Sequence, residues 1–198
     1  MIVYLFMIAA LGARPPTDFR DILIKKTVAQ IDQKNQQGSL SAALAYGNGF
    51  TATVLESAIV FYEMGLACNR QDKTQEAISY YNKALKIQPY MMEALYDRAE
   101  LYMLSGDLQM AKKDLQKALQ TNHWAVHFRL AEIAGREKDT DTLELQLTEA
   151  IRYGFPLNSL FQFGAHWQNW VKDPVLGRTL RRVIFLYGSE ELWQDFMQ

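Results

Sequence analysis

The sequence has 198 residues, which is long enough for one domain with a sizeable hydrophobic core. Its formal net charge of −1 creates no strong field for nucleic acid or an anionic membrane, so neither is expected as a partner. The single cysteine excludes an intramolecular disulfide and a zinc site built mainly of thiolates.

The N-terminal segment, residues 1–13, is almost wholly apolar and is followed by Arg14-Pro15-Pro16. A transmembrane helix needs roughly 20 apolar residues, whereas this length suits the hydrophobic region of a signal peptide. We therefore expect export to the periplasm or the cell exterior, although no Lys or Arg precedes the run. Two alternatives stay open, a first helix packed on the body and a one-sided membrane anchor, which would leave the protein cytoplasmic or membrane-proximal.

Residues 18–57 are expected to form an N-terminal helical cap. An amphipathic helix is predicted over 18–37, with Ile24, Val28 and Ile31 on one face and Gly38 as its stop. A second, short helix is predicted over 39–46, ended by the sequence Gly-Asn-Gly. Such a pair could cover the apolar end of a stack of helical repeats.

A repeat follows, because residues 58–91 can be laid over residues 92–125 without a gap. Small residues recur at the same points in both copies, namely Gly65, Ala77 and Ala84 in the first and Ala99, Ala111 and Ala118 in the second. Small side chains at fixed points let paired helices approach closely while large residues fill the neighbouring gaps. A third, weaker copy with a shortened turn ends at residue 155.

This pattern resembles the tetratricopeptide repeat. The resemblance implies an all-α fold, a right-handed α-solenoid of antiparallel helix pairs with N- and C-terminal capping helices. The three repeats would span 58–91, 92–123 and 124–155. Arg98 departs from the family pattern, since that position is usually apolar. The alternative fold is a generic helical bundle.

Residues 156–198 are expected to form an aromatic-rich C-terminal helical cap. Four large aromatic residues lie within ten positions, namely Phe161, Phe163, Trp167 and Trp170. Asp173-Pro174 is a strong helix start and predicts a helix to about residue 187, with a last short helix over 190–197.

Catalytic or metal chemistry finds little support in the sequence. His123 and His127 are four residues apart and could share a metal, but no neighbouring Glu completes a metalloprotease motif. Packing and turn roles are expected for both, and Cys68 is expected to be a buried small hydrophobe. With no phosphate-binding loop and no Gly-x-Ser-x-Gly motif, the sequence predicts neither an enzyme nor a bound cofactor or metal.

A partner-binding groove is what the resemblance implies instead. In tetratricopeptide arrays the first helix of each pair lines a concave groove, and Tyr62, Tyr96 and Phe128 would form an aromatic ladder along it. Ile59 takes another of these positions, and the predicted groove residues are Tyr62, Leu66, Asn69, Arg70, Tyr96, Glu100, Met103, Phe128, Glu132 and Arg136. The alternative is that the long, aromatic flanking segments fill this groove in the free protein.

The favoured function is a non-catalytic adaptor that holds an apolar helix or an extended peptide of another protein. The family's clamp for acidic chaperone tails is not matched, because Tyr62 and Leu66 replace its Lys and Asn. The alternative is a structural or assembly subunit that oligomerises or docks through its aromatic C-terminal segment. A metal protein using His123 and His127 is a third possibility.

Overall fold

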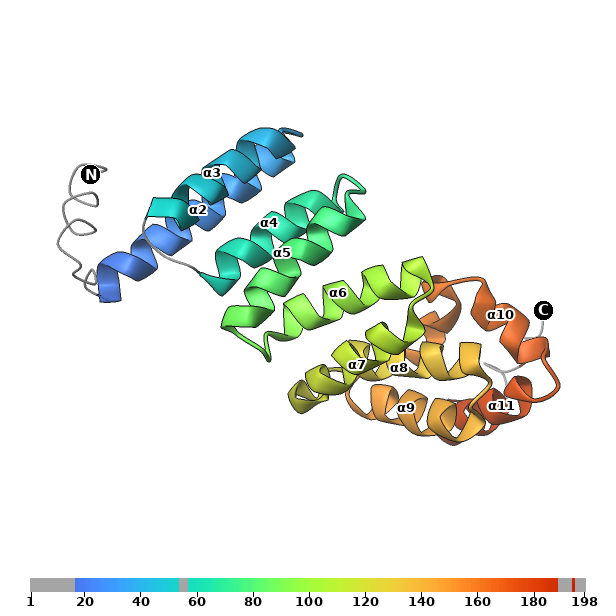
Figure 1. Cartoon of the computed structure of the whole chain (residues 1–198). Helices are drawn as coiled ribbons and strands as arrows, with labels where there is room; N and C mark the ends of the chain where they lie inside the picture. The colour runs from blue at the N-terminus through green and yellow to red at the C-terminus, as the bar shows by residue number, and fades with distance from the viewer. Residues whose placement is uncertain (1–16, 54–56, 189–193, 195–198) are drawn as a thin grey trace. The chain divides into compact units, whose positions relative to one another are not determined.

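The computed structural model describes residues 17–53, 57–188 and 194 (Figure 1). These residues form helices and, within those ranges, no strand. The chain divides into two compact units, residues 1–101 and 102–198, with the division inside helix α6 (Met92–Ser105). The expected all-α fold of antiparallel helix pairs is confirmed.

The first unit begins with a helix pair, α2 (Thr17–Gln36) and α3 (Leu40–Thr53), which lie side by side (Figure 1). Gly38 makes the turn between them with a φ of +73°, a conformation that glycine adopts without strain. The predicted stop of α3 at Gly47-Asn48-Gly49 is wrong, because the helix continues through these residues to Thr53.

Close packing explains why Gly47 is tolerated inside α3. A Cβ atom at this position would lie 2.5 Å from the sulfur of Met64 and 3.2 Å from Cδ1 of Ile31. Glycine in a helix interior costs about 1 kcal/mol relative to alanine. Here the contact that its small size permits between α3 and its neighbours offsets that cost.

The next pair, α4 (Ala58–Asn69) and α5 (Thr74–Ile87), also lies side by side (Figure 1). Its buried side chains follow the small–large–small pattern of the sequence. Ala77, Tyr81 and Ala84 are fully buried along one face of α5. Gly65 of α4 lies directly against the ring of Tyr81, where a Cβ atom would be 2.4 Å from Cε1. The missing side chain of Gly65 therefore makes room for the buried ring of Tyr81 on the partner helix.

Arg98 in α6 has a polar partner on the neighbouring helix. Its guanidinium donates a hydrogen bond from Nη1 to Oδ1 of Asn82 in α5. A polar partner within reach of the long side chain lets arginine occupy a position that the family pattern keeps apolar.

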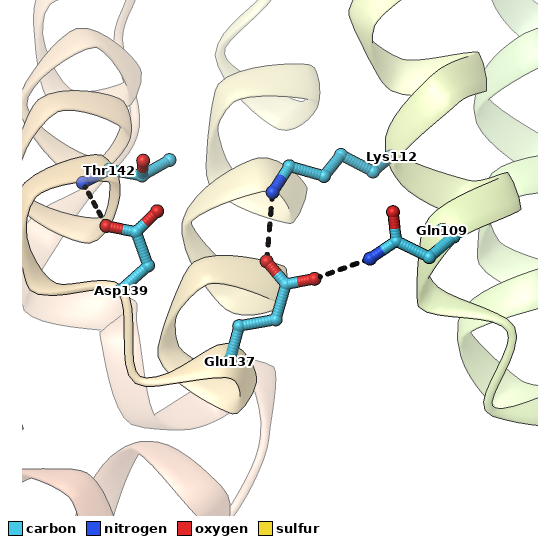
Figure 2. Close-up of polar contacts among 5 residues, drawn as sticks. All are labelled: Gln109, Lys112, Glu137, Asp139 and Thr142. Carbon is cyan, nitrogen blue, oxygen red and sulfur yellow. Dashed lines mark hydrogen bonds and ion pairs between the residues drawn. The ribbon is translucent and has the colours of Figure 1, made fainter.

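The second unit contains α7 (Leu108–Ala118), the short 3-10 helix η1 (Leu119–Thr121), α8 (Trp124–Glu137) and α9 (Thr140–Arg152). Asp139 caps α9, because its Oδ1 accepts the backbone N–H of Thr142 at 3.1 Å (Figure 2). Asp107 caps α7 in the same way through Met110.

Polar side chains join α7 to α8. Glu137, at the end of α8, accepts from Gln109 Nε2 at 3.0 Å and from Lys112 Nζ at 2.9 Å (Figure 2). Both donors lie on α7, one turn apart, so one carboxylate fixes two points of the neighbouring helix.

The C-terminal segment comprises η2 (Leu157–Phe163), α10 (His166–Lys172) and α11 (Leu176–Tyr187). Asp173 caps the start of α11 as predicted, because its Oδ1 accepts the N–H groups of Val175 at 2.8 Å and Leu176 at 2.9 Å. The helix itself begins at Leu176 and not at residue 174 as predicted. The inner face of α11 shares one core with α8 and α9; from α11 it includes Leu176, Leu180, Val183 and Ile184.

Two expectations lie outside the described residues: the signal peptide over 1–13 and, apart from residue 194, the last helix over 190–197. Within the described ranges, no helix has the length and apolar character needed to cross a bilayer.

Candidate partner-binding site

The first unit contains a cavity of about 420 Å³ formed by side chains of α2 and α4. We call it the α2–α4 pocket, and its lining residues are Ile24, Lys25, Val28, Ala29, Asp32, Ile59, Glu63, Leu66 and Arg70.

Helical periodicity explains why these residues share a face. On α2, Ile24, Val28 and Asp32 follow one another at intervals of four residues. On α4, Ile59, Glu63, Leu66 and Arg70 follow at intervals of four, three and four. Each helix therefore contributes a stripe that ends in a charged residue, and on α4 the carboxylate of Glu63 interrupts the apolar side chains.

One ion pair closes the charged end of the pocket. Arg70 Nη1 lies 3.0 Å from Asp32 Oδ1, and both side chains are partly open to solvent. An exposed pair of this kind contributes about 0–1 kcal/mol, so it orients the two helices more than it stabilises them.

Glu63 lies inside the pocket between the apolar side chains of α4. It is partly buried, and it makes no hydrogen bond or ion pair within the described part of the chain. Burial raises the pKa of its carboxyl above the ordinary value, and Asp32 raises it further, while Arg70 opposes them.

Three of the first-repeat positions carried over from the family line this pocket: Ile59, Leu66 and Arg70. Ile59 is 42% exposed, so an apolar side chain is presented to solvent at the pocket. The partly buried Asn69, at the last position of α4, does not line it.

Tyr62 has a different environment from its neighbours on α4. Its hydroxyl donates a hydrogen bond to Asp97 Oδ2 in α6 at 2.9 Å, and its ring lies 5.8 Å from that of Tyr81. Burial raises the pKa of Asp97 to about 6, with Glu100 and Glu93 adding to the rise and the Tyr62 hydrogen bond opposing it. Burial, together with Asp97, also raises the pKa of Tyr62.

The two other groove positions of α6 that belong to the first unit, Tyr96 and Glu100, are partly buried and do not line the α2–α4 pocket.

In the second unit, Phe128 is 1% exposed and lies under the C-terminal segment. Its ring centroid is 4.4 Å from that of Phe155, 5.0 Å from Phe163 and 5.2 Å from Trp167. A partner could reach this ring only after these aromatic side chains had moved.

Glu132 is also buried, with 1% of its surface exposed. Its carboxylate pairs with Arg129 of the same helix, and its Oε1 lies 2.8 Å from His166 Nε2 in α10. Burial would raise the pKa of Glu132, but His166 and Arg129 outweigh it and hold the pKa below its ordinary value.

The last two predicted groove residues of the second unit meet each other. Arg136 Nη1 donates to the backbone carbonyl oxygen of Met103 at 3.3 Å, and the Met103 side chain is buried.

The C-terminal segment covers Phe128 and Glu132, which is the self-filled arrangement that the sequence left open. That the ten predicted residues bind a partner stays a prediction.

Sequence reasoning missed the contribution of α2 to the pocket. The residues Ile24 and Val28 were recognised as an apolar stripe but were expected only to cap the repeats. Lys25, Ala29, Asp32 and Glu63 were not singled out. The available signal was the matching four-residue spacing of α2 and α4, which becomes informative once the two helices are known to be neighbours.

The histidines have structural contacts in this fold. His123 Nδ1 accepts the N–H of Ala125 at 3.2 Å and caps α8. His127 Nδ1 lies 2.9 Å from Gln146 Oε1, and its ring stacks on Tyr153 at 5.2 Å. In the portion of the chain that the structure describes, no three His, Cys, Asp or Glu side chains gather as metal ligands.

Cys68 is buried in the first unit. Burial raises the pKa of its thiol to about 11, which disfavours the reactive thiolate at neutral pH.

Comparison with known families identifies tetratricopeptide repeats at residues 58–91 and 93–122. The first corresponds to the α4–α5 pair, and the second spans α6 and α7.

Two curated proteins are similar to short parts of the chain. The probable biofilm formation methyltransferase WspC of Pseudomonas putida is 39% identical over 62 residues, 31% of this chain and 15% of that protein. The photosystem I assembly protein Ycf3 of Prochlorococcus marinus is 33% identical over 70 residues, 34% of this chain and 40% of that protein. The chain thus spans less than half the length of either relative.

Among solved structures, the fold is similar to MamA. Residues 41 to the end of MamA from Desulfovibrio magneticus RS-1 give a TM-score of 0.64 at 16% identity, covering 82% of this chain and 94% of that one. A double mutant of MamA RS-1 gives a TM-score of 0.64 at 17% identity, covering 87% and 95%. At this level of identity the likeness concerns the fold alone.

Proposed function

We propose that this chain, which contains two tetratricopeptide repeats, is a non-catalytic adaptor that binds a helix or extended peptide of another protein. The α2–α4 pocket is the proposed point of attachment. The observation that carries the proposal is an apolar pocket of about 420 Å³ on the first helix of the first repeat, with Ile59 presented to solvent.

The size and lining of the pocket suit apolar side chains of a partner. Pockets that hold small groups typically have volumes of about 300–1,000 Å³ and mostly apolar walls with a few polar groups that fix orientation. Here Ile24, Val28, Ile59 and Leu66 supply apolar walls. Removing such surface from water stabilises a complex by about 25 cal/mol for each Å² of apolar area buried.

The comparisons support a role in protein interaction. Two tetratricopeptide repeats are present, and one relative is named a photosystem I assembly protein. The other relative is named a methyltransferase, but the chain matches only 15% of its length. That match therefore provides no basis for proposing methyl transfer here.

A pair of matched substitutions tests the proposal. Ile59→Asp places a charge in the pocket, whereas Ile22→Asp makes the same change at an exposed position of α2 that does not line it. Proteins captured from extracts of the native cells should lose at least about tenfold in abundance with Ile59→Asp, because burying an unpaired carboxylate opposes binding. Ile22→Asp should leave the same proteins bound, and equal capture by both variants would contradict the proposal.

A second candidate function is self-assembly through the C-terminal part of α11. The aromatic cluster of the C-terminal segment is buried within its own unit, but Leu186 at the end of α11 is 71% exposed. If this end joins copies of the chain, Leu186→Asp should reduce the mass measured by light scattering to that of a monomer. An unchanged mass would remove this candidate.

We also propose export, from the apolar residues 1–13 alone. Sequencing the N-terminus of protein purified from the native cells tests this proposal. A mature chain that begins after residue 13 would support it, and one that begins at Met1 would contradict export with cleavage.

A further inference from the structure

We propose that the α2–α4 pocket selects a partner segment in which one Lys or Arg is flanked by apolar residues, with Glu63 as the counter-ion. This inference rests on the proposed adaptor function and adds the chemistry of the partner.

The position of Glu63 supplies the first argument. Ile59 precedes it by four residues and Leu66 follows it by three, so all three side chains lie on one stripe of α4 and line the pocket. A partner that fills the pocket with apolar groups must therefore pass beside a carboxylate.

The carboxylate of Glu63 has no partner of its own within the described residues. The cation that acts electrostatically on it, Arg70, is already joined to Asp32 at 3.0 Å. Lys25 also lines the pocket, but it is exposed and forms no ion pair among the described residues. Its long stem lets the ammonium group remain in water.

Covering the pocket with a purely apolar partner would strip water from Glu63 and leave a buried charge unpaired. Such burial is strongly unfavourable unless an opposite charge and hydrogen bonds compensate for it. An ammonium or guanidinium group from the partner provides both. Burial and Asp32 raise the pKa of Glu63 more than Arg70 lowers it, which is in keeping with a carboxylate that has no ion-pair partner of its own.

An acidic partner is disfavoured beside Glu63. It would bring a second carboxylate next to that of Glu63, and like charges repel.

The test is a selection from a phage-displayed library of random 12-residue peptides on the immobilised full chain. The wild type should enrich peptides with a Lys or Arg between apolar residues. Glu63→Gln should lose the preference for a basic residue but keep the apolar flanks. Glu63→Lys should enrich peptides that carry Asp or Glu at that place. Glu93→Gln, a change at an exposed glutamate outside the pocket, should select as the wild type does.

One enriched peptide is then synthesised with its basic residue and with norleucine in its place, and both are measured by calorimetry. The norleucine peptide should bind the wild type at least about tenfold more weakly than the basic peptide does. For Glu63→Gln, the affinities of the two peptides should differ much less.

The outcomes separate this inference from the function on which it rests. Peptides that lose binding with Ile59→Asp but carry no preferred basic residue would overturn the inference and leave the adaptor function standing. A selection that yields no peptide sensitive to Ile59→Asp would overturn both. A wild-type dimer that Ile59→Asp converts into a monomer would make a second copy the occupant and would also overturn the inference.

Discussion

Burial shapes the acid–base behaviour of Asp97, which accepts the Tyr62 hydrogen bond at 2.9 Å. Its folded pKa of about 6 lies above the ordinary value of 3.8. Between these values the folded chain binds more protons than the unfolded chain, so stability falls as pH rises. The contribution of Asp97 is therefore fully present below about pH 4 and is lost as pH rises through about 6.

We expect Asp97→Asn to remove this pH dependence. We compare the free energy of unfolding of the variant with that of the wild type at each pH. The difference, variant minus wild type, should be about 1–2 kcal/mol larger at pH 7.5 than at pH 5, allowing for solvent screening of a partly exposed group. Urea unfolding at the two pH values measures the difference. Asp141→Asn, at an exposed position of α9, is the control, and an Asp97→Asn difference that does not change with pH would contradict this account.

Glu132 shows the opposite behaviour, because its pKa is held below the ordinary value by His166 and Arg129 against the effect of burial. Its contribution to stability is present above the unfolded pKa of about 4.5 and is lost as pH falls through the lower folded value.

Glu132→Gln should lower the free energy of unfolding by about 2 kcal/mol at pH 7, because it leaves Arg129 and His166 without their common anion. Glu144→Gln is the matched control, since Glu144 pairs with Arg182 at the surface, and it should cost less than about 1 kcal/mol. Thermal and urea unfolding measure both. Equal losses would mean that burial adds nothing to the Glu132 interaction.

At the scale of helices, two helices approach closely where a glycine on one of them leaves room for a large side chain of the other. Gly65 permits the ring of Tyr81 to lie against α4, and Gly47 does the same for Met64 against α3. Gly49 lies in the same helix as Gly47, but a Cβ atom added there would meet no neighbouring atom within 4 Å. Alanine substitutions at these three positions therefore distinguish the effect of glycine on helix packing from its effect on helix propensity.

Gly65→Ala should destabilise the protein by about 2 kcal/mol, because the new methyl group would lie 2.4 Å from the Tyr81 ring and force it to move. Gly49→Ala should instead stabilise it by up to about 1 kcal/mol through helix propensity alone. Denaturant unfolding shows whether each variant has a lower or a higher free energy of unfolding than the wild type. A stabilising Gly65→Ala would show that the helices can separate without loss.

The sequence predicted the first two helix pairs because small and large residues recur there at a fixed interval, and a weaker third copy with a shortened turn extended the prediction to residue 155. It did not predict the full length of α3, because Gly47 and Gly49 read locally as a stop. Only the contact of Gly47 with Met64 shows why the helix continues. Local propensity is overridden here by packing against a distant part of the chain.

At the scale of the whole molecule, the second unit has a hydrophobic core to which the C-terminal segment contributes. In the second unit, α11 packs with α9 and α10 and buries Leu180 completely, in one core with Phe128 and Trp167. The C-terminal segment is therefore a structural part of this unit.

A chain shortened after residue 171 should lose the helical circular dichroism of more than the removed segment, because the core of the second unit would be opened. Leu180→Ala is a milder test and should cost about 3 kcal/mol through lost burial and the cavity left behind. Leu186→Ala, at an exposed position of the same helix, should change stability by less than about 0.5 kcal/mol. Similar losses for the two leucines would contradict the described core.

The candidate site could be predicted only in part. Leu66 and Arg70 were found because they belong to the repeat pattern, and both line the α2–α4 pocket. The α2 half of the pocket could not be predicted, since the sequence does not say which helix lies against α4. The burial of Phe128 and Glu132 likewise depends on where the C-terminal segment packs.

The most direct test of the adaptor function is photo-cross-linking in the native cells. A photoreactive phenylalanine analogue is placed at position 59, in the α2–α4 pocket, and in a second variant at position 22, outside it. We predict that position 59 yields a discrete cross-linked complex with another protein and that position 22 does not. Cross-linking of the same protein from both positions, or no complex from position 59, would contradict the proposal that a partner occupies this pocket.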